Sequence, residues 1–131
     1  MTNKINKVLI TLVAMLACAS NAYAGCTNPK FFGAWDVQFS DGTSCRLVLG
    51  RGGEVLADKS VCYDPSRGAT APDSGSYAVV PKDCEISASV VVQGVTIDLE
   101  GVFAIDRNTG HGRFLVPAFA VMGGYSMIRM P

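Results

Sequence analysis

Apolar and polar residues alternate along short segments over most of the chain after residue 32. In "WDVQF", Trp35, Val37 and Phe39 lie on one side of an extended chain, and the residues between them are polar. Successive side chains of a β-strand point to opposite faces, so this period of two predicts strands with one buried face. Beyond residue 25 no segment shows the period of an amphipathic helix, which indicates an all-β protein.

Turn residues separate the alternating segments. The glycines of "GRGG" (50–53) predict a hairpin that leads into a third strand around residues 55–57. The clearest hairpin covers residues 84–105, where "QG" joins two alternating runs and the second run places Ile105 on the inward face. Residues 63–74 are rich in Pro, Gly and small side chains, and we expect a surface loop there. Further strands are expected at 74–80, 111–116 and 125–130.

About eight antiparallel strands with short connections favour one small up-and-down barrel of the calycin type. Closure of the sheet would remove the exposed strand edges that an open sheet leaves. A sandwich of two sheets fits the same pattern and is the alternative fold. The interior of an eight-stranded barrel is either filled by side chains or holds one small ligand. The expected inward residues are mostly large and favour a filled interior: Trp35, Phe39, Leu47, Leu49, Ile97, Leu99 and Phe103.

The first 24 residues have the features of a secretory signal peptide. Lys4 and Lys7 precede an apolar run over residues 8–19, which is too short for a membrane-spanning helix. The small residues of "AYA" (22–24) place the cleavage site before residue 25. Residues 25–131 then form a single domain, which we expect in the periplasm or outside the cell.

Four cysteines remain when the signal peptide is removed: Cys26, Cys45, Cys62 and Cys84. An even number of cysteines in an exported chain predicts two disulfides, for which three pairings are possible. A competing interpretation starts from "AGC" (24–26), because this tripeptide also ends bacterial lipoprotein signals. Cys26 would then be acylated and would anchor the protein in the outer membrane. Lipoprotein signals usually have Leu where this chain has Tyr23, and acylation would leave one thiol unpaired, so soluble export is favoured.

The charged residues of the mature chain do not point to nucleic acid. Without the signal peptide, nine Lys and Arg residues stand against eleven Asp and Glu residues, and the two signs are interspersed. Nucleic acid and anionic membrane surfaces both require a basic patch, which this distribution lacks. We therefore expect no nucleic-acid partner, and membrane contact only through a lipid on Cys26.

The sequence has no recognisable catalytic arrangement. The single histidine, His111, lies between two glycines after a turn, and we expect it to be exposed and not part of a catalytic triad. Asp98 and Glu100 would point the same way from one strand, roughly 7 Å apart. Such a pair can serve glycoside hydrolysis, but it is more often the solvated face of a strand. We expect a protein that is not an enzyme and that uses no metal or cofactor.

A group of motifs over residues 33–62 suggests a family. Gly33 and Trp35 begin a strand, and Cys45 in "CRLVL", a glycine turn and Cys62 follow. This arrangement resembles the Inh family of bacterial periplasmic inhibitors of serralysin-type zinc metalloproteases, which includes related outer-membrane lipoproteins. The resemblance implies an eight-stranded barrel and a function in protease inhibition.

The resemblance also implies a disulfide between Cys45 and Cys62, which would leave Cys26 to pair with Cys84. Reflection through the "GRGG" turn places Cys45 opposite Asp58, so the chain would have to bend back before Cys62 could reach it. In the Inh family the segment before the first strand enters the protease cleft, where an extended arm can add main-chain hydrogen bonds. The residues of this chain that would form the arm are Thr27, Asn28, Pro29 and Lys30.

These observations predict a monomeric, exported, non-catalytic binding protein whose partner is a protein, and the resemblance makes that partner a secreted zinc metalloprotease. One alternative is a carrier of the lipocalin or avidin kind, which would need an interior cavity. Another is a structural lipoprotein of the envelope, anchored through Cys26. Beside the arm, two segments are candidates for partner contact, the loop at 63–74 and the apolar stretch at 116–125, unless the latter packs across a barrel mouth.

Overall fold

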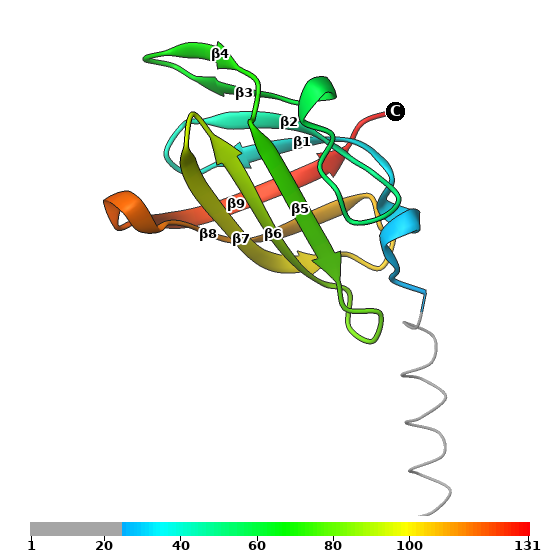
Figure 1. The fold of residues 1–131 in the computed structure, drawn as a ribbon. Helices are drawn as coiled ribbons and strands as arrows, with labels where there is room; N and C mark the ends of the chain where they lie inside the picture. The colour runs from blue at the N-terminus through cyan, green and yellow to red at the C-terminus, as the bar shows by residue number, and fades with distance from the viewer. Residues whose placement is uncertain (1–24) are drawn as a thin grey trace, which may run out of the picture.

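The computed structural model describes residues 25–131, so the expected signal peptide lies outside the described residues. Residues 25–131 form one antiparallel sheet of nine strands that curls into a half-barrel (Figure 1). The neighbouring strands follow the order β4-β3-β2-β1-β9-β8-β7-β6-β5. The strands are β1 (Gly33–Phe39), β2 (Ser44–Leu49), β3 (Val61–Asp64), β4 (Gly68–Thr70), β5 (Ser74–Val79), β6 (Glu85–Val92), β7 (Val95–Phe103), β8 (Thr109–Val116) and β9 (Val121–Arg129).

Three short 3-10 helices lie before or between the strands: η1 (Asn28–Phe31), η2 (Ala57–Lys59) and η3 (Pro117–Phe119). The prediction of an all-β domain is confirmed, with nine strands in place of eight. No helix among residues 25–131 has the length and apolar character needed to cross a bilayer.

The additional strand comes from the segment that was expected to be a surface loop. The predicted third strand at 55–57 is wrong, because the chain makes only an isolated bridge there and then enters η2. The third strand is β3, and a turn at residues 65–67 joins it to β4. This turn is stabilised by Asp64, whose carboxylate accepts hydrogen bonds from the Ser66 amide (2.9 Å) and hydroxyl (2.8 Å). The side-chain interaction of Asp64 within the turn therefore explains why this segment forms a hairpin.

The seam of the half-barrel lies between β2 and β5 and is closed over part of its length by residues 53–55. Val55 bridges Leu49 of β2, and Glu54 bridges Ser76 of β5. The Val55 amide donates to the Gly75 carbonyl (2.9 Å), and the Tyr77 amide donates to the Gly53 carbonyl (2.7 Å). These bonds satisfy two main-chain groups of β5 without a full strand and protect part of this edge from pairing with another chain.

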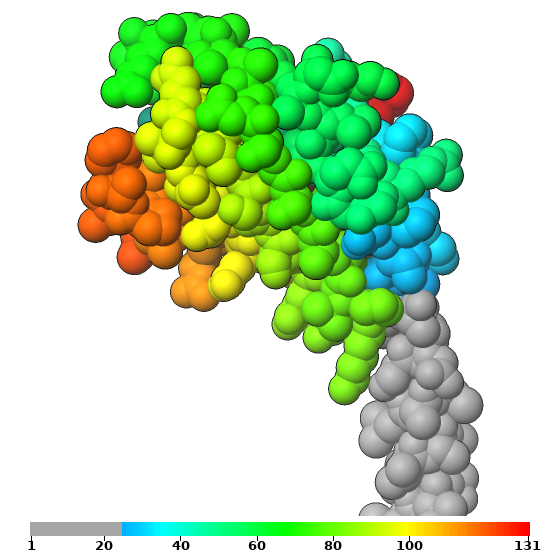
Figure 2. Space-filling model, in the orientation of Figure 1, coloured from blue at the N-terminus to red at the C-terminus, as the bar shows by residue number. Residues whose placement is uncertain are grey.

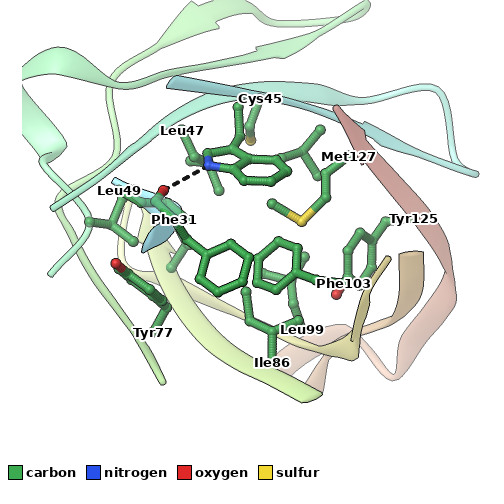
Figure 3. Packing of buried hydrophobic residues seen from close by; sticks show 14 of the residues in the cluster. Phe31, Cys45, Leu47, Leu49, Tyr77, Ile86, Leu99, Phe103, Tyr125 and Met127 are labelled. Atoms are coloured by element: carbon green, nitrogen blue, oxygen red, sulfur yellow. Dashed lines mark hydrogen bonds between the residues drawn. The ribbon is translucent and has the colours of Figure 1, made fainter. Parts of the chain in front are cut away.

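One end of the interior is filled by large side chains (Figure 3). The rings of Phe31 and Phe103 stack with centroids 4.0 Å apart, and Trp35 lies 5.0 Å from Phe103. The indole nitrogen of Trp35 donates to the Phe31 carbonyl (2.9 Å), so its polar atom is satisfied inside the core. The predicted inward positions of β1, β2 and β7 are confirmed up to Phe103, but Ile105 is 75% exposed because the strand has already ended.

Two glycines allow β7 and β8 to approach each other closely. Gly101 and Gly112 are directly opposite each other in this pair of strands. A Cβ on Gly101 would lie 2.2 Å from the His111 carbonyl oxygen and 2.5 Å from the Tyr125 hydroxyl. The absence of side chains at these two positions therefore lets the backbones approach closely, and at Gly101 it also leaves room for the Tyr125 hydroxyl.

Candidate functional site

The segment before β1, expected to be a partner-binding arm, is bonded across one end of the barrel. Cys26 is buried and forms a disulfide with Cys84, with a Cα–Cα distance of 5.2 Å. Thr27 precedes η1, which contains Asn28, Pro29 and Lys30 and ends at the fully buried Phe31. Figure 3 shows the Phe31 ring pointing into the core. The segment thus closes this end of the barrel as a plug.

Hydrogen bonds hold the plug on two sides. The Tyr77 hydroxyl donates to the Asn28 carbonyl (2.9 Å), and the Val79 amide donates to the Asn28 side-chain oxygen (3.2 Å). On the other side, the Arg129 guanidinium donates to the carbonyls of Lys30 (2.7 Å) and Phe32 (3.0 Å). The Tyr77 hydroxyl also contacts the Gly50 carbonyl. Insertion of this segment into a protease cleft would require all of these bonds to open.

Arg129 links three parts of the chain at the plugged end. Beside its bonds to residues 30 and 32, it donates to the Arg107 carbonyl from two nitrogens, at 3.0 and 3.3 Å. Its guanidinium also lies 4.8 Å from the centroid of the Trp35 ring. Partial burial lowers the pKa of Arg129 from its ordinary value, although the group keeps its charge.

The disulfide at Cys26 bears on the alternative of a lipid anchor, because both use the same sulfur atom. A bacterial lipid anchor is attached to the cysteine sulfur, and the sulfur of Cys26 is bonded to Cys84. Two disulfides are typical of an oxidising, extracytoplasmic compartment. The two disulfides therefore agree with export to such a compartment, and the lipid anchor at Cys26 stays a prediction.

The second disulfide joins Cys45 and Cys62, with a Cα–Cα distance of 4.0 Å. The two residues are directly opposite each other in the pairing of β2 with β3. The difficulty expected for this pairing disappears because "GRGG" does not lead into a regular hairpin strand. Instead, η2 turns the chain back, and β3 returns along β2 so that Cys62 meets Cys45.

The opposite end of the barrel is open and contains a cavity of about 320 Å³. Four connections surround it, namely the β1–β2 turn, the β3–β4 hairpin, the β6–β7 turn and η3. Figure 2 shows the hairpin in green, the β6–β7 turn in yellow and η3 in orange at one end of the molecule, away from the blue plug. The inner wall is apolar and includes the Cys45–Cys62 disulfide, Phe39, Val92, Ile97, Phe114 and Val116. We call this space the mouth cavity.

Aromatic and charged side chains surround the entrance of the mouth cavity. Tyr63 on β3 is 51% exposed and Phe119 on η3 is 65% exposed, although both line the cavity. Asp41, Asp64 and Arg67 add a few charges to the rim. Bonds from the Ser66 amide and hydroxyl hold the pKa of Asp64 below its ordinary value, so this carboxylate is ionised at neutral pH. The exposed apolar stretch at 116–125 is therefore partly explained as rim of the mouth cavity.

A second hollow, of about 600 Å³, lies on the outer face of β5 to β9. Asp98 and Glu100 line it from β7 together with Arg113 and several serines. The two carboxylates thus lie on the solvent side of the sheet, as expected for a polar strand face. His111 is exposed on β8, also as expected, although it lies within the strand and not in the turn. Within residues 25–131, no group of three His, Cys, Asp or Glu side chains could hold a metal ion.

The chain matches no protein-family model, and a search of curated proteins found no match. The Inh resemblance therefore depends on the motif residues at 33–62 alone.

The mouth cavity was not found from the sequence. The inward residues of the strands were correctly identified, but their positions along the barrel axis depend on the register and on the plug. One signal was present, because the inward side chains become smaller toward the β6–β7 turn, where valine stands at positions 92 and 95. Small side chains at one end and large ones at the other fill a barrel unevenly.

Proposed function

We propose that this protein is an exported binding protein that holds a small apolar ligand in the mouth cavity. The observation that carries the proposal is the open cavity of about 320 Å³ with an apolar wall and a few polar groups at its rim. Ligand sites are typically concave, mostly apolar and about 300–1,000 Å³ in volume, and barrel mouths are among their preferred places. The cavity falls at the lower end of this range, which favours a ligand with one or two rings or a short acyl chain.

Preorganisation supports the same conclusion. The Cys45–Cys62 disulfide holds β3 beside β2, so the β3–β4 hairpin is fixed next to the cavity before any ligand arrives. The plug fills the other end of the barrel, so the mouth is the open end from which a ligand can enter. A site that is rigid before binding loses less entropy when the ligand binds. The predicted signal peptide and the two disulfides favour the periplasm or the outside of the cell as the place of action.

A fluorescence titration tests the proposal. N-phenyl-1-naphthylamine becomes fluorescent in apolar surroundings, and we expect saturable binding of one molecule to the purified chain of residues 25–131. Val116→Trp places an indole in the cavity wall and should abolish binding, because the cavity has no room for both groups. Ile105→Trp adds the same side chain at an exposed position at the plugged end and should bind as the unchanged protein does. Equal binding by Val116→Trp would contradict the proposal.

A second candidate is inhibition of a secreted zinc metalloprotease. The Gly33 and Trp35 motif favours it, as does the Cys45–Cys62 disulfide, which is the pairing that the Inh resemblance implies. Because the segment of Thr27 to Lys30 is bonded to the barrel, inhibition would involve either another surface or an opened plug. Titration of a serralysin-type protease with the protein tests this candidate. Stoichiometric loss of protease activity would support it, and full activity at a large excess would exclude it for that class of protease.

A further inference from the structure

Tyr125 carries a buried hydroxyl that has no partner. Among residues 25–131, it is the one buried side-chain nitrogen or oxygen atom without a hydrogen bond. The residue is only 5% exposed. Buried polar atoms in proteins are nearly always paired, and an exception calls for an explanation such as a ligand or a water molecule. The orphan hydroxyl is therefore an observation that points to a missing binding partner.

The hydroxyl lies at mid-height in the barrel, between the plug and the mouth cavity. Tyr125 is opposite Phe39 on β1 and opposite Gly112 on β8. Its side chain extends across β8, since a Cβ on Gly101 of β7 would lie 2.5 Å from the hydroxyl oxygen. Figure 3 shows the hydroxyl pointing into the interior, close to Leu99 and Phe103.

Two phenylalanines separate the hydroxyl from the mouth cavity. Phe39 and Phe114 both line the cavity, and their rings meet edge to face with centroids 5.1 Å apart. Phe39 also packs against Tyr125, with centroids 6.4 Å apart. Tyr125 is thus the next side chain behind the inner wall of the cavity. Gly101 leaves the space that the Tyr125 hydroxyl needs, since a Cβ there would lie 2.5 Å from it.

The Tyr125 hydroxyl is suited to donate a hydrogen bond, because it does not ionise at physiological pH. Burial raises the pKa of Tyr125 to about 12, and the Glu100 carboxylate adds to the shift. The phenol therefore keeps its proton over the whole range of physiological pH. In apolar surroundings, a neutral donor discriminates strongly between a ligand that carries an acceptor and one that does not, because only the first satisfies it.

We propose that the Tyr125 hydroxyl is the specificity determinant of the mouth cavity and donates a hydrogen bond to a single acceptor oxygen, such as a ketone, at the leading end of an otherwise apolar ligand. This inference rests on the proposed function. Because Tyr125 lies behind the lining of the mouth cavity, the proposal requires the Phe39 side chain to turn aside so that the ligand reaches the hydroxyl. The hydrogen bond then satisfies the unpaired hydroxyl. The site therefore selects ligands that carry an acceptor oxygen, whether or not they are charged.

Two competitors of nearly the same shape test the inference by displacing N-phenyl-1-naphthylamine. These are 2-acetylnaphthalene, which carries a ketone oxygen, and 2-isopropylnaphthalene, which carries none. In Tyr125→Phe, we expect the affinity for the ketone to fall about tenfold, as loss of one hydrogen bond predicts. The affinity for the hydrocarbon should remain within about twofold. The thermal midpoint should not fall, because the substitution removes an unpaired oxygen.

Tyr77→Phe is the matched control. It removes a hydroxyl that is bonded to the plug, so it should lower the thermal midpoint and leave the ratio of the two affinities unchanged. Equal changes for both competitors in Tyr125→Phe, or no change for either, would overturn the role of Tyr125 while leaving the proposed function intact. Failure of both competitors and of the probe to bind the unchanged protein would overturn the proposed function, and this inference with it.

Discussion

Removal of the Cys26–Cys84 disulfide by the double substitution Cys26→Ser and Cys84→Ser should strongly destabilise the protein. A disulfide restricts the unfolded chain, and the effect increases with the length of the closed loop. The two cysteines are 58 positions apart, which corresponds to about 4 kcal/mol of unfolding free energy in the chain-entropy relation. The Cys45–Cys62 disulfide spans only 17 positions, which gives about 3 kcal/mol. Small domains have about 5–15 kcal/mol in total, so either loss is large.

Urea denaturation of the purified chains, followed by tryptophan fluorescence, measures these costs. We expect the midpoint to fall in both double variants and to fall further when Cys26 and Cys84 are replaced. The dependence of the free energy on urea should also become steeper, because an unfolded chain without the cross-link exposes more surface. A loss below about 1 kcal/mol for the Cys26–Cys84 variant would refute the reasoning. Such a result would mean that the plug is not held by this bond, and it would reopen the question of what Cys26 does.

Three further substitutions or conditions have defined outcomes. Gly101→Ala forces a Cβ against the His111 carbonyl and should lower the free energy of unfolding, measured in urea, by about 2 kcal/mol or more. Gly124→Ala should be nearly neutral, because a Cβ there has only ordinary contacts. Equal effects of the two substitutions would contradict the close approach of β7 and β8. Arg129→Ala removes the hydrogen-bond donors to three carbonyls and should lower the free energy of unfolding by about 1–3 kcal/mol. Arg129→Lys keeps the charge and should recover only part of that loss. Full recovery in the lysine variant would show that the charge alone matters. Burial raises the pKa of both Tyr77 and Tyr125 to about 12, above the ordinary value of 10.0, so the unfolded chain loses these protons first. Their contribution to stability is therefore complete below pH 10 and lost as the pH rises toward 12, and an unchanged urea midpoint over that range would contradict the burial of both phenols.

Much of the fold could be predicted from the sequence because alternation of apolar and polar residues is a local property. Trp35, Val37 and Phe39 belong to the core, and "QG" at 93–94 forms the tight turn between β6 and β7, where Gln93 and Gly94 both have positive φ (51° and 77°). The Cys45–Cys62 pairing was implied by resemblance and not by the local pattern. The pattern even argued against it, because a hairpin through "GRGG" would have put Cys62 out of reach.

The features that could not be predicted depend on contacts between distant segments. β3 and β4 are short, and they form because Asp64 stabilises their turn and a disulfide holds β3 to β2. The plug requires Phe31 to meet Phe103, which is far away in the sequence. The mouth cavity lies at the end of the barrel that the plug does not fill. No local pattern carries this information, since it is set by where the strands end in space.

An NMR titration of the isotope-labelled chain of residues 25–131 with N-phenyl-1-naphthylamine tests the proposed ligand site most directly. We expect the amide signals of Val92, Val116 and Phe119 to shift in a saturable way, because these residues surround the mouth cavity. Signals of Phe31 and Arg107 at the plugged end should stay in place. Shifts confined to the outer face of β5 to β9, or no saturable shifts at all, would contradict the assignment of the mouth cavity as the ligand site.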